Sequence, residues 1–306
     1  MISWPDLGTR VTVRYRRPGG SVPPLTDAVG HLLAVDPVVR VQTKTGAVVE
    51  FAAADVVALR VLTDAPVRTS QIRALEYAAA AAWPGVERTW LDGWLLRAGH
   101  GAGFAANSAV PLDISAHIDT TPAIVAWYER RGLTPRLAIP DRLLPLPSGL
   151  TGERTERVLV RDVSDVSGRE PDPSIILSAR PDDAWLRIYQ RKVPVEVLTA
   201  VVDGELMFGT HPGVAVARAA LTGGPDGTRW VGLSALKAAD DQSATGPASR
   251  LCEALLVWGA RRGATRGYLQ VGDSNTRATT LTDSLGFRLH HRRRYFPART
   301  HTWDTV

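Results

Sequence analysis

Apolar and polar side chains alternate repeatedly over residues 6–62, and this pattern predicts the short strands of a small all-β module. The alternating runs fall at 9–15, 28–35, 38–43, 47–51 and 56–61. Short strands separated by Pro- and Gly-containing turns predict an SH3-like β-barrel over residues 1–63. Such a module either binds a ligand or docks against its neighbour, and both roles stay open.

Residues 68–146 combine helical and strand patterns. One helix is predicted from Thr69 through an alanine run to Trp83, and another over residues 121–131. Strands are predicted at 87–98, 103–110 and 135–139. The segment is therefore expected to form a mixed lobe of its own.

Residues 147–173 are rich in Pro, Gly, Ser and charged residues, which predicts a linker with one strand-like run at 158–160. Residues 174–306 then follow a β-α-β-β-β-β-α-β-α-β order. The predicted elements are a strand from 174, a helix at 182–189, strands at 195–202, 205–209, 213–221 and 230–238, a helix at 247–262, a strand at 267–271, a helix from 275 and a strand ending at 296. The strands at 230–238 and 267–271 flank a helix, so we expect parallel neighbours joined by a right-handed crossover.

The start of the predicted helix at 247–262 has the features of an anion-binding turn. Pro247 suits a first helical turn, and the residues before it carry only small side chains: Ser243, Ala244, Thr245 and Gly246. Backbone N–H groups can converge there without obstruction, and the helix dipole adds partial positive charge. We predict that this turn binds a phosphate or pyrophosphate, with Arg250 adding charge.

Several short motifs follow one another in a specific order over residues 229–287. They are Gly246-x-Ala248, Trp258-Gly259-Ala260, Leu269-Gln270-Val271, Asn275-x-x-Ala278 and Leu285-Gly286-Phe287. In this order they resemble the GNAT superfamily of acetyl-CoA-dependent N-acetyltransferases. The resemblance implies an α+β (α/β) fold with a mixed, splayed sheet over residues 174–306, and acetyl-CoA as the cosubstrate.

Within this lobe, the run Ala123-x-x-Ala126-Trp127-Tyr128 that ends at Gly132-Leu133 resembles the end of another GNAT domain, with Tyr128 where the family's acid would sit. No pyrophosphate turn precedes it, so we expect a degenerate lobe that completes or covers the acceptor cleft. A core-packed Tyr128 is the alternative. An SH3-like module followed by tandem lobes also resembles family members labelled histone-acetyltransferase-like.

The resemblance assigns cofactor contacts residue by residue. Leu236, Lys237 and Ala238 match the splayed strand that hydrogen-bonds the pantetheine arm. The pyrophosphate contacts map to Ser243, Ala244, Thr245, Gly246, Pro247, Ala248 and Ser249. On the following helix, Asn275, Ala278 and Thr282 are the expected contacts, and Asn275 either bonds the pantetheine or orders the next turn.

Two departures from the family pattern concern catalysis. Ser243 stands where the family usually has Arg or Gln, and Thr282 stands where it often has a tyrosine that protonates the thiolate. A threonine hydroxyl is too weak an acid for that role. Tyr295 is a candidate acid or a core residue, and His290 and His291 are candidate bases or surface residues.

Composition narrows the remaining classes. Hydrophobic residues make up 44% and charged residues 22%, as in an ordinary globular protein, and neither a membrane-length apolar run nor a signal-peptide core is present. The single cysteine, Cys252, excludes an internal disulfide, and no ligand spacing indicates a metal. The net charge of +5 leaves nucleic acid open as a minor alternative. We therefore expect a cytoplasmic enzyme.

The sequence thus predicts an N-acetyltransferase that moves acetyl from acetyl-CoA to a primary amine by direct attack. The acceptor is left open among a protein lysine, a protein N-terminus and a small-molecule amine. The alternative is a catalytically weak CoA-binding regulatory or DNA-associated protein.

Overall fold

The computed structural model describes residues 4–62, 67–146, 150–170, 172–239 and 245–298. The chain divides into two compact units, Met1–Pro66 and Val67–Val306, each with its own core. No helix within the described ranges is both long enough and apolar enough to cross a membrane.

In its described residues, the first unit is an antiparallel five-stranded sheet in the order β4-β3-β2-β1-β5. Its strands are β1 (Arg10–Arg16), β2 (Leu25–Ala34), β3 (Val39–Thr43), β4 (Val48–Phe51) and β5 (Val56–Val61). Alternate residues such as Val11, Val13, Leu32 and Val41 are fully buried, which is the period-two pattern on which the strand prediction rested. All five predicted strands are therefore confirmed.

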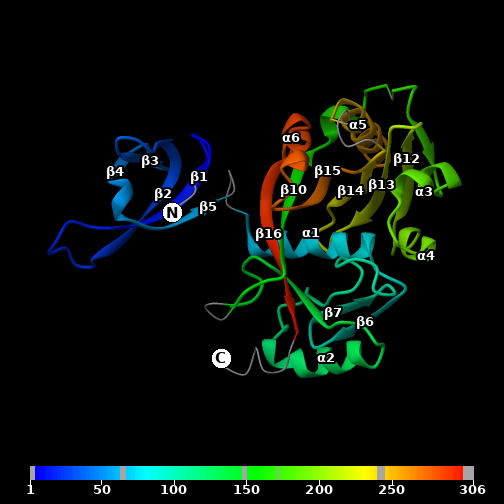
Figure 1. Cartoon of the computed structure of the whole chain (residues 1–306), viewed down its shortest axis with the longest axis horizontal. Coiled ribbons are helices and arrows are strands. Elements are labelled where there is room, and N and C mark those ends of the chain that lie inside the picture. The colour runs from blue at the N-terminus through cyan, green and yellow to red at the C-terminus, as the bar shows by residue number, and fades with distance from the viewer. Residues whose placement is uncertain (1–3, 63–66, 147–149, 171, 240–244, 299–306) are drawn as a thin grey trace. The chain divides into compact units, whose positions relative to one another are not determined.

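The described part of the second unit is built on an eight-stranded sheet in the order β11-β12-β13-β14-β15-β10-β16-β9, with a smaller sheet β6-β7-β8 (Figure 1). The small sheet consists of β6 (Glu87–Leu91), β7 (Trp94–Ala98) and β8 (Val110–Pro111). The large sheet consists of β9 (Arg136–Pro140), β10 (Arg154–Asp162), β11 (Ile176–Ser178), β12 (Glu205–His211), β13 (Ala215–Gly223), β14 (Arg229–Ala238), β15 (Arg266–Gly272) and β16 (Arg288–Pro297).

Helices cover both faces of the large sheet. On one face α5 (Thr245–Arg261) and α6 (Thr276–Ser284) pack on the main core, to which β13, β14 and β15 also contribute. On the other face α1 (Thr69–Ala82) packs on Val158, Trp230 and Tyr268. Here α3 (Asp183–Tyr189) and α4 (Val195–Leu198) lie against Phe208 and Val216. The remaining helix, α2 (Thr121–Glu129), packs on the small sheet.

The predicted linker at 147–173 differs from the structure, because β10 lies within the large sheet between β15 and β16. Val158 pairs with Gln270 on one side and with His291 on the other. The charged residues that suggested a linker are partly buried in ion pairs; Glu156, for example, is 7% exposed. The strand that precedes the C-terminal half therefore completes its sheet.

Three strand predictions in this unit were wrong in detail. The run at 195–202 contains α4, which begins after Pro194 and buries the consecutive residues Val197 and Leu198, as a helical turn does and an alternating strand does not. The run at 87–98 is a hairpin that turns at Asp92 and Gly93, both with positive φ. Most of 103–110 is a turn-rich loop, in which the Asn107 side chain accepts hydrogen bonds from two backbone N–H groups.

Candidate functional site

The central feature of the second unit is a fork between two parallel strands. β14 and β15 pair only from Trp230 with Arg266 to Leu233 with Leu269. Beyond that point residues 234–238 of β14 continue along β13, while residues 270–272 of β15 continue along β10. We call the space where the two strands part the fork. Within the fork, the edge of β14 and the edge of β15 that face each other are not paired with one another.

A β-bulge shapes the β14 side of the fork. Arg218 on β13 pairs with Ser234 and Val216 pairs with Lys237, so Ala235 and Leu236 together face one residue of the partner strand. Ala235 has φ of 53°, a left-handed conformation that is rare for a residue with a side chain. The predicted pantetheine contacts Leu236, Lys237 and Ala238 are half-buried and lie on this bulged segment.

The predicted pyrophosphate turn is described only in part. Ser243 and Ala244 lie outside the described residues, as does the side chain of Thr245, whose backbone begins α5. Gly246 has open space where a Cβ would stand, and Ala248 is buried against the main core. Pro247 and Ser249 lie in the first turns, as predicted. The start of α5 is therefore a helix N-terminus whose backbone at Gly246 is not covered by any described side chain.

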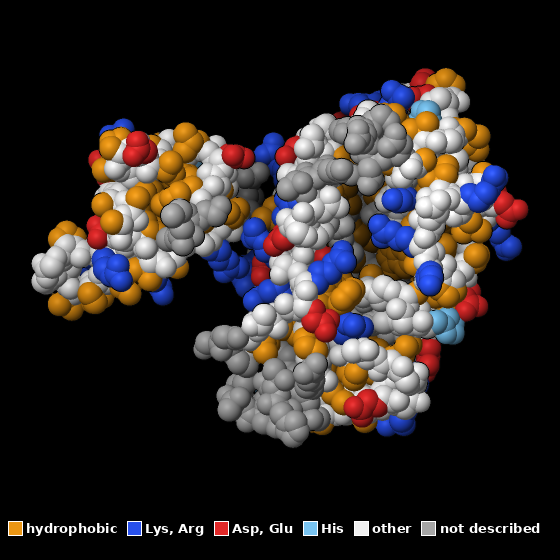
Figure 2. All heavy atoms as spheres, in the orientation of Figure 1, with side chains coloured by type: hydrophobic (Ala, Val, Ile, Leu, Met, Phe, Trp, Pro, Cys, Tyr) orange, Lys and Arg blue, Asp and Glu red, His pale blue; other side chains and the backbone are white. Residues whose placement is uncertain are grey.

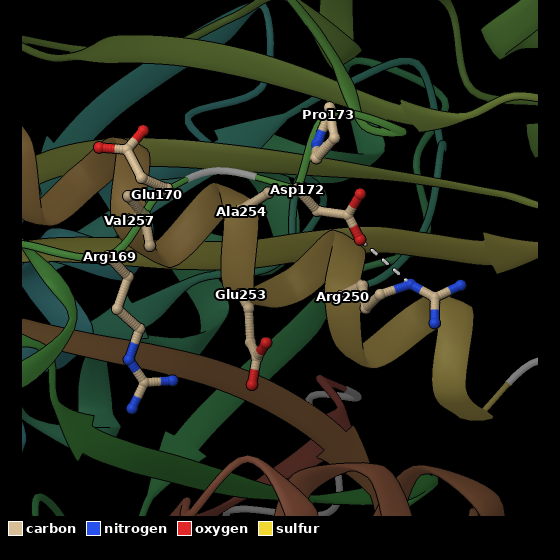
Figure 3. Close-up of a pocket in the computed structure, with 8 residues that line it drawn as sticks. All are labelled: Arg169, Glu170, Asp172, Pro173, Arg250, Glu253, Ala254 and Val257. Carbon is tan, nitrogen blue, oxygen red and sulfur yellow. Dashed lines mark ion pairs between the residues drawn. The ribbon is translucent and has the colours of Figure 1, made fainter.

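Arg250, predicted to add charge at this turn, is half-exposed and pairs with Asp172 at 3.2 Å between Nε and Oδ2. Figure 3 shows this pair at one end of a pocket of about 420 Å³ along the outer side of α5. The pocket is lined by Arg169, Glu170, Asp172, Pro173, Arg250, Glu253, Ala254 and Val257. Its opposing charges are already paired in part, so it offers no single class of charge to a ligand.

A second pocket, of about 480 Å³, borders the end of β15. It is lined by Glu153, Arg154, Thr155, Gly272, Asp273, Ser274 and Asn275. Because Gly272 is the last residue on the β15 side of the fork, this polar pocket adjoins the open end of the fork.

The predicted contacts on α6 have local roles in this structure. The Asn275 side chain accepts a hydrogen bond from the N–H of Ala278 at 3.1 Å and so caps the helix. Thr282 is 2% exposed, and its hydroxyl donates to the carbonyl of Thr279 at 2.9 Å. Asn275 thus orders the next turn, as one of the two predicted roles stated, and the Thr282 hydroxyl is already engaged.

Tyr128 and Tyr295 are both fully buried. The Tyr128 hydroxyl donates to the carbonyl of Arg97 at 3.0 Å, and the Tyr295 hydroxyl donates to the carboxylate of Glu156 at 3.2 Å. Burial raises the pKa of both phenols. Tyr128 is therefore a core residue, the alternative that the sequence left open, and Tyr295 has no exposed surface with which to contact a substrate.

His290 and His291 do not lie at the surface, so the surface prediction was wrong. A bulge in β16 directs both rings into the interior, where their Nδ1 atoms are 2.8 Å apart. Nε2 of His291 lies 2.8 Å from the carboxylate of Glu76 on α1. Burial, together with the adjacent His291, lowers the pKa of His290 to about 3. The neutral imidazole is thus favoured.

Two buried charged groups, Glu76 and Arg218, were missed from the sequence. Glu76 accepts from Arg293 at 2.9 Å, and although burial alone raises its pKa, Arg293 and His291 hold that pKa at about 2. The only sequence signal for Arg218 was a charged residue within the apolar run Ala215–Leu221, which does not tell a buried arginine from an exposed one.

Comparisons with known proteins agree with this geometry. Residues 69–296 match the family model "Probable histone acetyltransferase Rv0428c C-terminal", and residues 5–60 match "Rv0428c N-terminal Sm-like domain". The first unit thus matches an Sm-like domain, and the predicted SH3-like fold is not established. The prediction and the match agree that the unit is a small β-module.

Individual relatives point the same way. The chain is 71% identical to a protein named "Probable histone acetyltransferase Rv0428c" from Mycobacterium tuberculosis, and the match covers the full length of both proteins. It is 23% identical over 71% of its length to "Uncharacterized N-acetyltransferase YobR" from Bacillus subtilis, of which it covers 94%.

A solved structure has the same fold. A GCN5-related N-acetyltransferase from Kribbella flavida superposes with a TM-score of 0.51 at 13% identity, over 76% of this chain and 95% of that one. The chain therefore belongs to the Rv0428c family and is a GNAT-type N-acetyltransferase.

Proposed function

We propose that the protein transfers acetyl from acetyl-CoA to a primary amine by direct attack in a ternary complex. The observation that carries the proposal is the fork, since β14 and β15 stop pairing after Leu233 and Leu269 and leave strand edges to receive the pantetheine arm. Transfer needs a neutral amine, a donor for the carbonyl oxygen and a proton source for the departing thiolate.

The residues at the fork fit such a cosubstrate. In the proposal, the bulged segment at Leu236, Lys237 and Ala238 hydrogen-bonds the pantetheine, and its backbone N–H groups polarise the thioester carbonyl. The pyrophosphate rests on the amides at the start of α5, where Gly246 leaves the backbone open. In the proposal Asn275 and Ala278 contact the cosubstrate from α6, whereas the Thr282 hydroxyl is buried and bonded to Thr279.

The described side chains that were candidates for acid or base are held in the interior. Tyr295, His290 and His291 are each at most 6% exposed. In the proposed reaction, backbone N–H groups at the bulge therefore polarise the carbonyl, and water carries the protons. Most of the rate acceleration comes from holding the two substrates in reactive positions.

The acceptor proposed is a primary amine, with a protein lysine first because the 71% identical relative is named a probable histone acetyltransferase. The proposal also includes a cytoplasmic location and an SH3-like fold for the first unit. Protein N-termini and small-molecule amines are the competing acceptors.

A CoA-binding protein with weak catalysis is the second candidate, favoured by the internal hydrogen bond of Thr282. A DNA-associated role would require steeply salt-dependent binding. Lys and Arg side chains are spread over the visible face of the second unit rather than gathered in one stripe (Figure 2). Thiol release from acetyl-CoA with a panel of amines and peptides separates an enzyme from both alternatives.

A negative charge introduced at the α5 turn tests the proposed cofactor site. Gly246→Glu places a carboxylate where a phosphate is proposed to lie. Among the described residues no atom stands within 4 Å of the new Cβ, so the fold is expected to tolerate the change. CoA affinity by calorimetry should fall at least about 100-fold. Gly223→Glu, also in open space but at the end of β13, is the matched control and should bind CoA normally. Unchanged affinity in Gly246→Glu would exclude this turn as the pyrophosphate site.

A further inference from the structure

A buried arginine that pairs with no described carboxylate borders the fork. Arg218 on β13 is 0% exposed, and its guanidinium carbon lies 4.3 Å from the ring centre of Trp83. Among the residues that the structure describes, no Asp or Glu forms an ion pair with it. Fully buried charges are ordinarily paired, so this arrangement requires an explanation.

Neutral acceptors hold the Arg218 guanidinium in place. Nε donates to the carbonyl of Leu198 at 2.7 Å, and Nη2 donates to the carbonyls of Ala82 at 2.8 Å and Ala200 at 2.9 Å. Nη1 lies 3.3 Å from the hydroxyl oxygen of Ser234. These contacts fix the position of the charge without neutralising it. Burial lowers the pKa of Arg218 to about 10, so the side chain stays protonated at neutral pH.

The position of this charge in the sheet is specific. Leu233 is the last residue of β14 that pairs with β15, and Ser234, which Arg218 contacts, is the next residue along the strand. The guanidinium therefore contacts the side chain of the first β14 residue past the point where the two strands part. Tyr268 covers Gly232 on the same face, where any larger side chain would collide with its ring.

We propose that Arg218, held against Ser234, assists acetyl transfer by placing a fixed positive charge beside the fork. In the reaction the amine nitrogen bonds to the thioester carbon, the C–S bond breaks with its electron pair on sulfur, and one N–H proton ends on that sulfur. A cation at the fork stabilises the negative charge on the carbonyl oxygen and then on the thiolate. This inference rests on the proposed function, because it requires the thioester to lie in the fork.

The direct measurement is the pKa of the thiol of CoA bound to the full chain, followed by the ultraviolet absorbance of the thiolate. A nearby cation favours the thiolate, so the pKa of bound CoA should be about one unit higher in Arg218→Met than in the native protein. Arg218→Lys retains the positive charge, so the pKa of bound CoA should stay close to its value in the native protein. Arg97→Met, which removes another fully buried arginine held by Trp83 and Ser108, is the control and should leave the thiol pKa unchanged.

A second pair of variants covers the case in which Arg218→Met does not fold. Ser234→Asp places a carboxylate beside the guanidinium and neutralises it, and should raise the pKa of bound CoA as Arg218→Met does. Ser234→Asn has a similar shape without charge and should retain the native value. Equal thiol pKa values across all these variants would overturn the inference while CoA binding still stood. Failure of the native protein to bind CoA would overturn both it and the proposed function.

Discussion

Two buried charged groups on the face of the large sheet covered by α1 differ in how their charge is balanced. In the first, Arg293 lies between Glu76 at 2.9 Å and Glu156 at 2.7 Å, and each of these side chains is at most 7% exposed. In the second, Arg218 contacts carbonyl groups and Ser234 but no carboxylate among the described residues. Both contact α1, the first through Glu76 and the second through the carbonyl of Ala82.

The comparison shows that the charge of Arg293 is neutralised by carboxylates, whereas the charge of Arg218 is not neutralised by any described carboxylate. The first group, here called the compensated group (Glu76, Glu156 and Arg293), joins α1, β10 and β16, three segments distant in sequence. Arg154 pairs with the other oxygen of Glu156 at 3.0 Å, so two positive charges oppose two negative charges. Arg218 lies beside the fork, where acetyl transfer would generate negative charge if the thioester binds as proposed. The buried ion pairs of Arg293 link distant segments of the fold, whereas the charge of Arg218 is proposed to act on the transferring acetyl group.

The largest expected loss of stability comes from a substitution that removes one carboxylate from the compensated group. Glu76→Gln leaves Arg293 buried with one carboxylate fewer, and this should lower the free energy of unfolding by about 3 kcal/mol in urea denaturation of the full chain. Glu205→Gln, which removes an exposed partner of Arg262, is the control and should cost less than about 1 kcal/mol.

The pH dependence supplies a check on that effect. The pKa of Glu76 is held at about 2, below its ordinary 4.5. Its carboxylate therefore stabilises the folded chain above about pH 4.5, and this contribution is lost as the pH falls toward 2. The difference between the native protein and Glu76→Gln should shrink over that range. A constant difference would contradict the assignment of the charge to Glu76.

These groups also show what the sequence could and could not reveal. The strands of the first unit, α5 and the two strands of the fork were predictable because their burial repeats at the period of one element. The partners of Arg293 are 137 and 217 positions away in the chain, and no local pattern marks them. For this reason the charged run containing β10 suggested a linker, and Arg218 beside the fork was missed.

A smaller effect concerns His290, at the edge of the compensated group. Its folded-state pKa of about 3 lies below the ordinary 6.5, so the unfolded chain takes up a proton that the folded chain does not. The free energy of unfolding should fall as the pH drops below 6.5, by about 2 kcal/mol at pH 5. His290→Gln should remove this slope between pH 6.5 and 5, whatever its stability at pH 8. An unchanged slope would assign the titration to another group.

The smallest effect sharpens the contrast between a structural and a catalytic group. Tyr295→Phe removes one hydrogen bond to Glu156, whose carboxylate keeps its bond to Arg293, so the loss of stability should be about 1 kcal/mol. Because Tyr295 is fully buried, the rate of thiol release from acetyl-CoA should remain within about twofold of the native rate, at every pH from 6 to 9. A rate loss of 100-fold or more with little loss of stability would make Tyr295 the acid after all. The compensated group would then belong to the chemistry, and the division between a structural pair and a functional lone cation would fail.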